Sequence, residues 1–391
     1  MTRARKLITV SHSYVVTLNR RLANELARVG AGRWEVTAVA PPFFQGDLSP
    51  IQLKPEPGEA SRLEPVRALF SRSAHLFVYG PELRARLSSG VDLVHSWEEP
   101  YVLAGAEVAL LTPRRVPLVF ATAQNLFKRY PPPFAQLERW VVDRSAGWVA
   151  YGETVKQNLL LRPGYARRPA RYIPMGVDVE LFRPDRALGA EFLRELGWEA
   201  EGPPVVGYLG RFVPEKGVEL LRGVLERLTT PWRALFVGGG PMEQSLRAWA
   251  ERQGPGKVRI VTGIPHARVP QVLNAMDVLC APSQTTPRWK EQFGRMLAEG
   301  FACGVPVLTS DSGEIPHTAG DAGQVLPEAD SAAWTKALAE LLESPERRRE
   351  LSARGRERAV TRFSWPVVAR AHLDFFESVL GSNSHHTAAR P

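Results

Sequence analysis

The sequence predicts an α/β protein that contains two doubly wound parallel sheets. Short apolar runs alternate with amphipathic stretches of helical length, for example at 18–27 and 134–143, and parallel strands buried on both faces have this composition. The alternation starts again in the second half of the chain. Since 391 residues exceed the roughly 100–200 residues of an average domain, two domains are expected.

The expected strands fall into one set in each half of the chain. The first set is LITV (7–10), VTAVA (36–40), DLVHS (92–96), PLVFAT (117–122) and GWVAY (147–151). The second set is PPVVGYLG (203–210), RALFVGG (233–239), VRIVTG (258–263), VLCAP (278–282) and VPVLTS (305–310). Because helical patterns separate the strands in both sets, each half is predicted to form its own doubly wound sheet.

The two halves are joined by a stretch in which the periodicity is lost. The segment IPMGVDVELFRPD (173–185) is dense in Pro, Gly and Asp, which is typical of a connection. We therefore predict an N-terminal domain over 1–178 and a C-terminal domain over 179–363. Residues 364–380 have an amphipathic helical pattern, and 381–391 are expected to be a disordered tail.

Composition narrows the class of protein. A hydrophobic content of 44% and a charged content of 23% are ordinary for a soluble globular protein. No apolar run reaches the ~18 residues of a membrane-spanning helix, and the first residues lead into a strand-like segment rather than a signal peptide. A cytoplasmic location is therefore expected. Cys280 and Cys303 are too few for a disulfide framework or a zinc site, and both are expected to be buried.

Positive charge is concentrated in the N-terminal half. Residues 1–171 contain 24 Lys or Arg and 14 Asp or Glu, a balance of +10, whereas the whole chain carries +9. Such a half suits an anionic membrane face, a phosphate-bearing ligand or nucleic acid, and a plain solvated surface explains it equally well.

Arg211 and Lys216 follow an expected strand at its carboxyl end, where doubly wound sheets bind ligands. They belong to the pattern G-R-x-x-x-E-K-G (210–217). The planar guanidinium can bind two oxygens and the ammonium adds a compact charge, so together they suit a diphosphate. A basic loop with a glycine turn is the alternative.

Glu291 and Glu299 lie eight residues apart around the start of an apolar helical pattern. Glu291 precedes this helix and Glu299 lies about two turns inside it, so one carboxylate can reach the sugar of a ligand and the other its ribose. Amides near Gly294 and Arg295 favour phosphate by roughly 0.3–1 kcal/mol. Two glutamates on a solvated helix are the alternative.

Four motifs in this order resemble the retaining glycosyltransferases of family 4, which have the GT-B fold. They are G-R-x-x-x-E-K-G (210–217), V-G-G-G-P (237–241), M-D-V-L-C-A-P-S (276–283) and E-Q-F-G-R-M-L-A-E-G-F-A-C-G-V-P-V (291–307). The segments I-P-M-G-V-D-V-E-L-F-R-P (173–184) and R-F-S-W (362–365) match as well. The resemblance covers most of the chain and is strongest from 173 to 310.

The resemblance implies two Rossmann-like domains that face a cleft, a donor bound in the C-terminal domain, and a last helix that crosses back to the N-terminal domain. Arg211 and Lys216 are implied to bind the donor diphosphate, and Glu291 the transferred sugar. The further donor-binding residues implied are Gly210, Gly240, Ile264, Phe293, Gly294, Arg295 and Glu299, with Glu299 on the ribose. The implied reaction is a same-face substitution in which the donor phosphate helps to deprotonate the acceptor.

The N-terminal domain departs from the family pattern. The loop after the first strand reads S-H-S-Y (11–14) where relatives often have glycines, and Gln124 and Asn125 follow the PLVFAT strand where many relatives have a histidine. Our acceptor-side candidates after expected strands are His12, Ser13, His95, Glu98, Glu99, Gln124, Asn125, Lys128 and Arg129. K-R-Y-P-P-P-F (128–134) suits a phosphate-linked or lipid-linked acceptor, and a rigid turn explains it equally well.

We therefore expect a metal-independent hexosyltransferase that uses a nucleoside-diphosphate sugar, with UDP favoured and no cofactor, in cell-envelope, glycolipid or polysaccharide synthesis. No D-x-D triplet is present, although Asp178 and Glu180 mimic one. No nucleic-acid partner is expected, and a peripheral contact with the inner face of the cell membrane stays open. The alternatives are a nucleotide-sugar epimerase, a phosphorylase, and a catalytically silent sugar-nucleotide binder or scaffold. An NAD-dependent oxidoreductase is disfavoured because no G-x-G-x-x-G follows the first strand.

Overall fold

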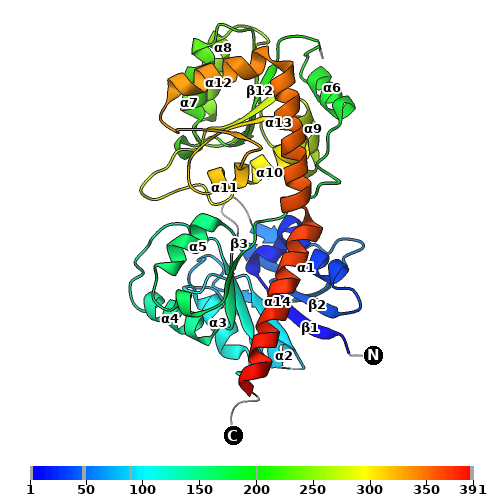
Figure 1. The fold of residues 1–391 in the computed structure, drawn as a ribbon, viewed down its shortest axis with the longest axis vertical. Coiled ribbons are helices and arrows are strands. Elements are labelled where there is room, and N and C mark those ends of the chain that lie inside the picture. The colour runs from blue at the N-terminus through cyan, green and yellow to red at the C-terminus, as the bar shows by residue number, and fades with distance from the viewer. Residues whose placement is uncertain (1–2, 46–49, 89, 200, 388–391) are drawn as a thin grey trace. The chain divides into compact units, whose positions relative to one another are not determined.

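The computed structural model describes residues 3–45, 50–88, 90–199 and 201–387, and Figure 1 shows their arrangement in each unit with many of the helices and some strands labelled. The chain forms two compact units. Unit 1 comprises Met1–Pro174 and Trp365–Pro391, and unit 2 comprises Met175–Ser364. Each unit is built on a parallel sheet, so the predicted α/β class with two doubly wound halves is confirmed.

Unit 1 contains a seven-stranded sheet in the order β11-β10-β9-β8-β1-β2-β5. Its strands are β1 (Arg5–Val10), β2 (Trp34–Ala40), β5 (Arg62–Pro65), β8 (Leu93–Ser96), β9 (Leu118–Thr122), β10 (Gly147–Ala150) and β11 (Ala170–Tyr172). The order reverses between β1 and β8, where Val10 lies opposite Ser96. The segments that follow these two strands therefore start side by side, at the position where open α/β sheets bind ligands.

The helices of unit 1 cover this sheet, and two small hairpins lie beside it. The helices are η1 (His12–Val15), α1 (Thr17–Val29), α2 (Glu82–Ser88), α3 (Leu103–Leu111), α4 (Phe134–Arg144), α5 (Glu153–Leu160), η2 (Tyr165–Arg167) and α14 (Trp365–Thr387). The hairpins pair β3 (Phe43–Gln45) with β4 (Pro50–Gln52) and β6 (Ala68–Leu69) with β7 (Val78–Tyr79).

The last helix, α14, packs along α1 (Figure 1). The indole nitrogen of Trp34 donates to Glu377 Oε1 on α14 over 3.3 Å, and Arg33 contacts the same oxygen at 3.1 Å. The helix continues to Thr387, so residues 381–387 of the expected tail are helical. Residues 388–391 of that tail lie outside the described residues.

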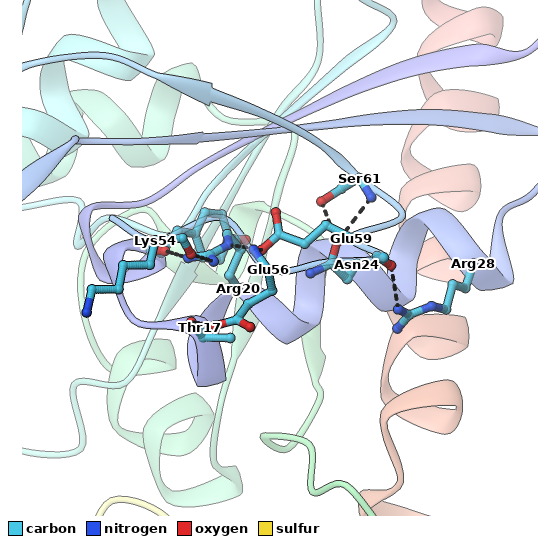
Figure 2. A network of polar contacts seen from close by, with 10 residues as sticks. Thr17, Arg20, Asn24, Arg28, Lys54, Glu56, Glu59 and Ser61 are labelled. Carbon is cyan, nitrogen blue, oxygen red and sulfur yellow. Dashed lines mark hydrogen bonds and ion pairs between the residues drawn. The ribbon is translucent and has the colours of Figure 1, made fainter. Parts of the chain in front are cut away.

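A buried arginine ties α1 to the segment that precedes β5, as Figure 2 shows. Arg20 is 0% exposed. Its guanidinium donates to Glu59 Oε1 over 2.7 Å, to the carbonyl of Lys54 over 2.5 Å and to the carbonyl of Tyr14 over 2.6 Å. Since the charge is both paired and hydrogen-bonded, its burial is compensated. The contact with Tyr14 also fixes η1.

Unit 2 contains a six-stranded parallel sheet in the order β14-β13-β12-β15-β16-β17. Its strands are β12 (Val205–Arg211), β13 (Arg233–Gly239), β14 (Val258–Val261), β15 (Val278–Ala281), β16 (Val307–Ser310) and β17 (Gln324–Leu326). The order reverses between β12 and β15, the counterpart of the reversal between β1 and β8.

The helices of unit 2 alternate with these strands. They are α6 (Arg186–Glu195), η3 (Pro214–Lys216), α7 (Val218–Arg227), α8 (Glu243–Arg252), η4 (His266–Arg268), α9 (Val269–Asn274), α10 (Arg295–Ala302), α11 (Ile315–Ala319), α12 (Ser331–Glu343), α13 (Pro345–Arg358) and η5 (Ala359–Phe363). Apolar faces of these helices and both faces of the sheet form the core of the unit. The edge strands β5, β11 and β17, which were not predicted, have only three or four residues each.

No helix in the described ranges combines the length and the apolar character that crossing a membrane requires.

Candidate functional site

In unit 2, a lysine and a glutamate meet where the strand order reverses. Lys216 ends η3 after β12, and Glu291 lies on the segment after β15. The Lys216 ammonium is 2.5 Å from Glu291 Oε2, to which the Ser283 hydroxyl donates over 3.2 Å. The ammonium also lies 4.7 Å from the ring centroid of Trp289. The predicted phosphate-binding lysine and sugar-binding glutamate are thus in direct contact.

Two glycines let these loops approach each other. Gly217 has φ 71°, and a Cβ there would lie 1.8 Å from the carbonyl oxygen of Pro282. Gly313 has φ 58°, and a Cβ there would lie 2.2 Å from the carbonyl oxygen of Glu291. Positive φ and these close contacts both exclude other residues. The final glycine of G-R-x-x-x-E-K-G is therefore a packing requirement of the site.

The helix α10 carries the second glutamate. Gly294 caps its N-terminus in the left-handed conformation, and Arg295 is its first residue. Glu299 is buried, and its Oε1 lies 2.8 Å from Nε2 of His266 in η4. The carboxylate at the expected ribose position is thus already oriented by an imidazole.

The other predicted donor residues of unit 2 are also at the carboxyl ends of strands or in the segments that follow. Arg211 ends β12, is largely exposed and lies 3.7 Å from Glu215. Gly240 follows β13, and a Cβ there would lie 2.6 Å from the carbonyl oxygen of Phe212. Phe293 is buried, and Ile264 is partly buried against the core. Gly210 is the residue before Arg211 in β12.

In unit 1, a histidine and a glutamate occupy the corresponding reversal. His12 opens η1 after β1, and Glu98 follows β8. Glu98 Oε2 lies 2.7 Å from His12 Nδ1, and Glu98 Oε1 accepts from the His12 backbone N–H and from the Tyr79 hydroxyl, each over 2.6 Å. Burial by itself lowers the pKa of His12, but the charge and the hydrogen bond of Glu98 outweigh it and raise the pKa above 6.5.

The neighbouring carboxyl of Glu99 is held differently. It accepts from the Thr122 hydroxyl over 2.6 Å and from the backbone N–H of Ala123 over 2.9 Å. Burial raises the pKa of Glu99 to about 7, although both hydrogen bonds favour the charged form. Glu99 therefore titrates near neutral pH.

The remaining acceptor-side candidates divide by exposure. Gln124 and Asn125 are buried, and the Gln124 amide donates to the Tyr130 hydroxyl over 3.0 Å. Lys128 and Arg129 are exposed and line a cavity of about 430 Å³ together with aromatic side chains. Ser13 contacts the hydroxyl of Ser11 at 2.8 Å.

The expectation that His95 faces a ligand is wrong. His95 lies inside β8 and is 0% exposed, with its ring 5.8 Å from that of His372 on α14. Burial, followed by the proximity of His372, lowers its pKa well below 6.5. The side chain is buried because α14 covers this face of the sheet, with the ring of Phe376 5.3 Å from that of His95. Cys280 and Cys303 are buried, as expected.

Sequence reasoning missed four polar or aromatic partners at these sites. They are Ser283, Trp289, His266 and Tyr79. Ser283 and His266 follow expected strands within a few residues, which is the signal that could have identified them. In the described residues, no group of three or more His, Cys, Asp or Glu is arranged to hold a metal ion.

Two family models match the chain, one in each half. The model of the Glycosyl transferases group 1 matches residues 191–358, and that of Glycosyltransferase Family 4 matches residues 15–181. A D-inositol 3-phosphate glycosyltransferase of Nocardia farcinica is 31% identical over 314 residues, which is 74% of this chain and 67% of that protein. The chain belongs to the group 1 glycosyltransferases. The predicted family is thereby confirmed.

Other members of the family match over shorter stretches. A GDP-mannose-dependent alpha-(1-6)-phosphatidylinositol monomannoside mannosyltransferase of Mycolicibacterium smegmatis is 34% identical over 202 residues, covering 50% of this chain and 52% of that protein. The chain spans about half the length of the first curated relatives that it matches.

Two solved structures share the fold of this chain. Anabaena HepE in complex with UDP has a TM-score of 0.73 at 17% identity and covers 96% of this chain and 100% of its own. A glycosyltransferase from Rickettsia africae has a TM-score of 0.74 at 16% identity and covers 97% and 99%. These matches extend through both units and support the GT-B fold.

Proposed function

We propose that this protein is a retaining glycosyltransferase that moves a sugar from a nucleoside-diphosphate sugar to an acceptor hydroxyl. The observation that carries the proposal is the contact of Lys216 with Glu291 at the strand reversal of unit 2, beside the N-terminus of α10. A cation, a helix terminus and a hydroxyl-binding carboxylate converge there, which is the combination that a sugar diphosphate requires.

The roles follow from the chemistry of each group. Lys216 and Arg211 neutralise the departing diphosphate, Glu291 binds the transferred sugar, and Glu299 binds the ribose with His266 orienting its carboxylate. Lys216 leaves Glu291 for the diphosphate when the donor binds. Once the donor is bound, these positive charges stabilise the negative charge that develops on the departing diphosphate.

UDP is the nucleotide that we favour in the donor, and GDP is the main alternative. Anabaena HepE, which shares the fold, was solved with UDP, whereas the mannosyltransferase of M. smegmatis is named as GDP-mannose-dependent. Backbone near Ile264 and Gly240 is our candidate for contact with the base and the phosphates, and side chains around it decide between the two nucleotides.

For the acceptor, we propose a phosphate-linked or lipid-linked molecule of the cell envelope, glycosylated at the cytoplasmic face of the membrane. Support comes from the charge of +10 over residues 1–171 and from exposed Lys128 and Arg129 beside a cavity. The matched relatives include a phosphatidylinositol monomannoside mannosyltransferase and a D-inositol 3-phosphate glycosyltransferase.

We propose that transfer needs no divalent cation, because Lys216 and Arg211 can balance the diphosphate charge. Turnover is therefore expected to be the same with EDTA and with added magnesium. Activity that vanishes with EDTA and returns with magnesium would contradict this part of the proposal.

A thermal-shift panel tests the donor site directly. The purified chain is titrated with UDP, GDP, ADP and TDP and with their sugars in metal-free buffer, since a ligand of the native state raises Tm. One nucleotide is expected to raise the Tm of the wild type. The same nucleotide is expected to leave the Tm of Glu299→Ala unchanged. No shift with any member of the panel would favour a silent scaffold instead.

A further inference from the structure

Two neighbouring loops of unit 1 expose apolar side chains. The first, 69–77, connects β6 to β7, and the second, 123–133, connects β9 to α4. Twelve large hydrophobic residues are exposed in the described part of the chain, and four of them lie in these two loops. They are Leu69, Phe70, Leu76 and Phe127. Single exposed apolar residues are ordinary, whereas several in adjoining loops mark an interaction site.

The two loops meet at one cavity of unit 1. Its volume is about 430 Å³, and its lining includes His75 from the first loop and Lys128 and Arg129 from the second. The ring of His75 lies 6.3 Å from that of Phe134, which begins α4. We call residues 69–77 and 123–133 together the loop surface.

The backbone of Phe70 has a conformation that a bulky side chain disfavours. Its φ is 60°, and in the described residues it is the one non-glycine position with a positive φ. An aromatic residue in the left-handed region costs free energy. Burial within unit 1 does not offset this cost, because Phe70 is 74% exposed. The ring is therefore available for a contact outside the chain.

The first loop is nevertheless anchored to the body of unit 1. Phe77 is 0% exposed. The backbone N–H of Leu103 donates to the carbonyl of His75 over 3.1 Å. The backbone N–H of Tyr79 donates to Glu107 Oε2 over 2.6 Å. Since the backbone beside the exposed apolar side chains is held in place, less conformational entropy is lost when a partner binds.

Basic side chains accompany the apolar ones, and acidic residues are missing from both segments. Arg72 in the first loop and Lys128 and Arg129 in the second are exposed. Residues 65–81 and 123–137 contain no Asp or Glu. Apolar side chains with cations beside them suit a membrane with anionic headgroups, because the former enter the acyl boundary while the latter stay at the phosphates.

We propose that the loop surface docks this protein on a membrane with anionic headgroups. Phe70 and the three other exposed apolar side chains enter the boundary between headgroups and acyl chains, and the three cations contact headgroup phosphates. The inference rests on the proposed function and deepens it, because it names the partner that presents a lipid-linked acceptor to the side of unit 1 where Lys128 and Arg129 line a cavity.

Vesicle sedimentation tests the docking. The whole purified chain is mixed with vesicles of one part phosphatidylglycerol to two parts phosphatidylcholine, and separately with vesicles of phosphatidylcholine alone. Each cation at an anionic surface strengthens binding roughly fivefold, so the partition coefficient is expected to be at least about tenfold higher with the anionic vesicles. Equal partition onto both kinds of vesicle, or no binding to the anionic ones, would overturn the proposal.

Phe70→Gly isolates the apolar contribution. Glycine readily adopts a φ of 60°, so the Tm of this variant is expected to be no lower than that of the wild type. Loss of the exposed ring is expected to lower the partition coefficient about tenfold or more. Phe70→Trp is expected to keep the wild-type coefficient, because Trp favours membrane interfaces.

The matched control for the apolar variant is Leu110→Ser. Leu110 is 70% exposed on α3 and lies outside the loop surface. This variant is expected to keep the wild-type partition coefficient. A wild-type coefficient for Phe70→Gly, or an equal loss in Leu110→Ser, would contradict the assignment of the contact to this surface.

The double variant Lys128→Gln, Arg129→Gln isolates the charge. Its partition onto the anionic vesicles is expected to fall about 10- to 30-fold, and the binding that is left is expected to respond less to salt. Arg114→Gln with Arg115→Gln changes an exposed basic pair outside the loop surface and is expected to keep the wild-type coefficient. Equal losses in the two double variants would show attraction to the overall charge and would refute the proposed surface.

Sedimentation velocity without vesicles tests the competing occupant, a second copy of this chain. The docking proposal predicts that Phe70→Gly and the wild type have the same oligomeric state. Self-association of the wild type that is lost in Phe70→Gly, together with no binding to vesicles, would assign the loop surface to a second copy and overturn the membrane.

Nucleotide binding separates the docking from the proposed function. Because the proposed donor residues belong to unit 2, Phe70→Gly is expected to keep the wild-type Tm shift with the nucleotide. If a nucleotide raises the Tm of the wild type and the anionic vesicles do not bind, the docking alone is refuted. If the vesicles bind and no nucleotide raises Tm, the proposed function fails and the loop surface remains a membrane-binding site.

Discussion

The strand reversals of units 1 and 2 carry the same kind of contact with different chemistry. In unit 2 an ammonium meets a carboxylate, Lys216 with Glu291. In unit 1 an imidazole meets a carboxylate, His12 with Glu98, and the imidazole changes charge in that range. The same topology thus brings a lysine to a carboxylate in one unit and a titratable imidazole to a carboxylate in the other.

The loops at the two strand reversals are also held in place by different kinds of contact. Close backbone packing at Gly217 and Gly313 supports the loops of unit 2. Side-chain hydrogen bonds support unit 1, where buried Arg20 holds the carbonyl of Tyr14 in η1. Glycine contacts leave a sequence signature, whereas a buried arginine does not reveal its partners. This explains why the family motifs are clear in one half and weak in the other.

The largest effect is expected from Arg20→Ala, which tests whether unit 1 depends on buried side-chain contacts. The change removes the hydrogen-bond donor of the Glu59 carboxylate and of the carbonyl groups of Tyr14 and Lys54, which surround the buried side chain. The free energy of unfolding is expected to fall by about 3–5 kcal/mol, measured by urea unfolding. Arg139→Ala, at an exposed arginine of α4, is the matched control and is expected within ~0.5 kcal/mol of wild type. An equally small loss for Arg20→Ala would show that the network is not structural.

Lys216→Ala tests the fixed charge of unit 2. Removal of one preorganised group at a leaving group costs roughly 10²–10³ in rate, and turnover is expected to fall at least tenfold with the fold intact by circular dichroism. Lys336→Ala, at an exposed lysine of α12, provides the control. Wild-type turnover from purified Lys216→Ala would refute the role of this residue.

Glu299→Ala sharpens the comparison on the binding side. Hydrogen bonds to a charged group contribute about 1.5–3 kcal/mol, so Kd for the nucleotide is expected to rise roughly 10- to 100-fold, measured by calorimetry. Glu340→Ala, exposed on α12, should leave Kd unchanged. Equal Kd values for both variants would remove Glu299 from the donor site.

Glu99→Gln gives the smallest expected effect and isolates titration in unit 1. Because the pKa of Glu99 is raised to about 7 from 4.5, the folded state binds more protons than the unfolded state between these pH values. Stability therefore falls as pH rises through this window. Glu99 is only half-buried, and water reduces the effect, so wild type is expected to lose about 2 kcal/mol more than Glu99→Gln between pH 5 and 8. Parallel pH profiles from urea unfolding would contradict this expectation.

The sequence by itself determined the alternation of strands and helices and the motifs that mark the family. Buried parallel strands require continuous apolar runs, and each of the ten expected runs overlaps a strand of one of the two sheets. The edge strands β5, β11 and β17 escaped prediction because three or four residues at an edge carry little apolar signal. Lys216, Glu291 and Gly217 could be singled out from the sequence because they belong to local motifs in the segments that follow strands.

Tertiary structure alone decided which side chains meet. His12 and Glu98 are 86 residues apart, and Lys216 and Glu291 are 75 apart. Only the strand order, which places β1 beside β8 and β12 beside β15, brings each pair into hydrogen-bond range. His95 and His12 both lie near strand ends in the sequence. In the folded unit His95 is buried, whereas 32% of the His12 side chain is exposed. Periodicity reports the environment of a residue along its own element, whereas sheet order and long-range packing select its partners.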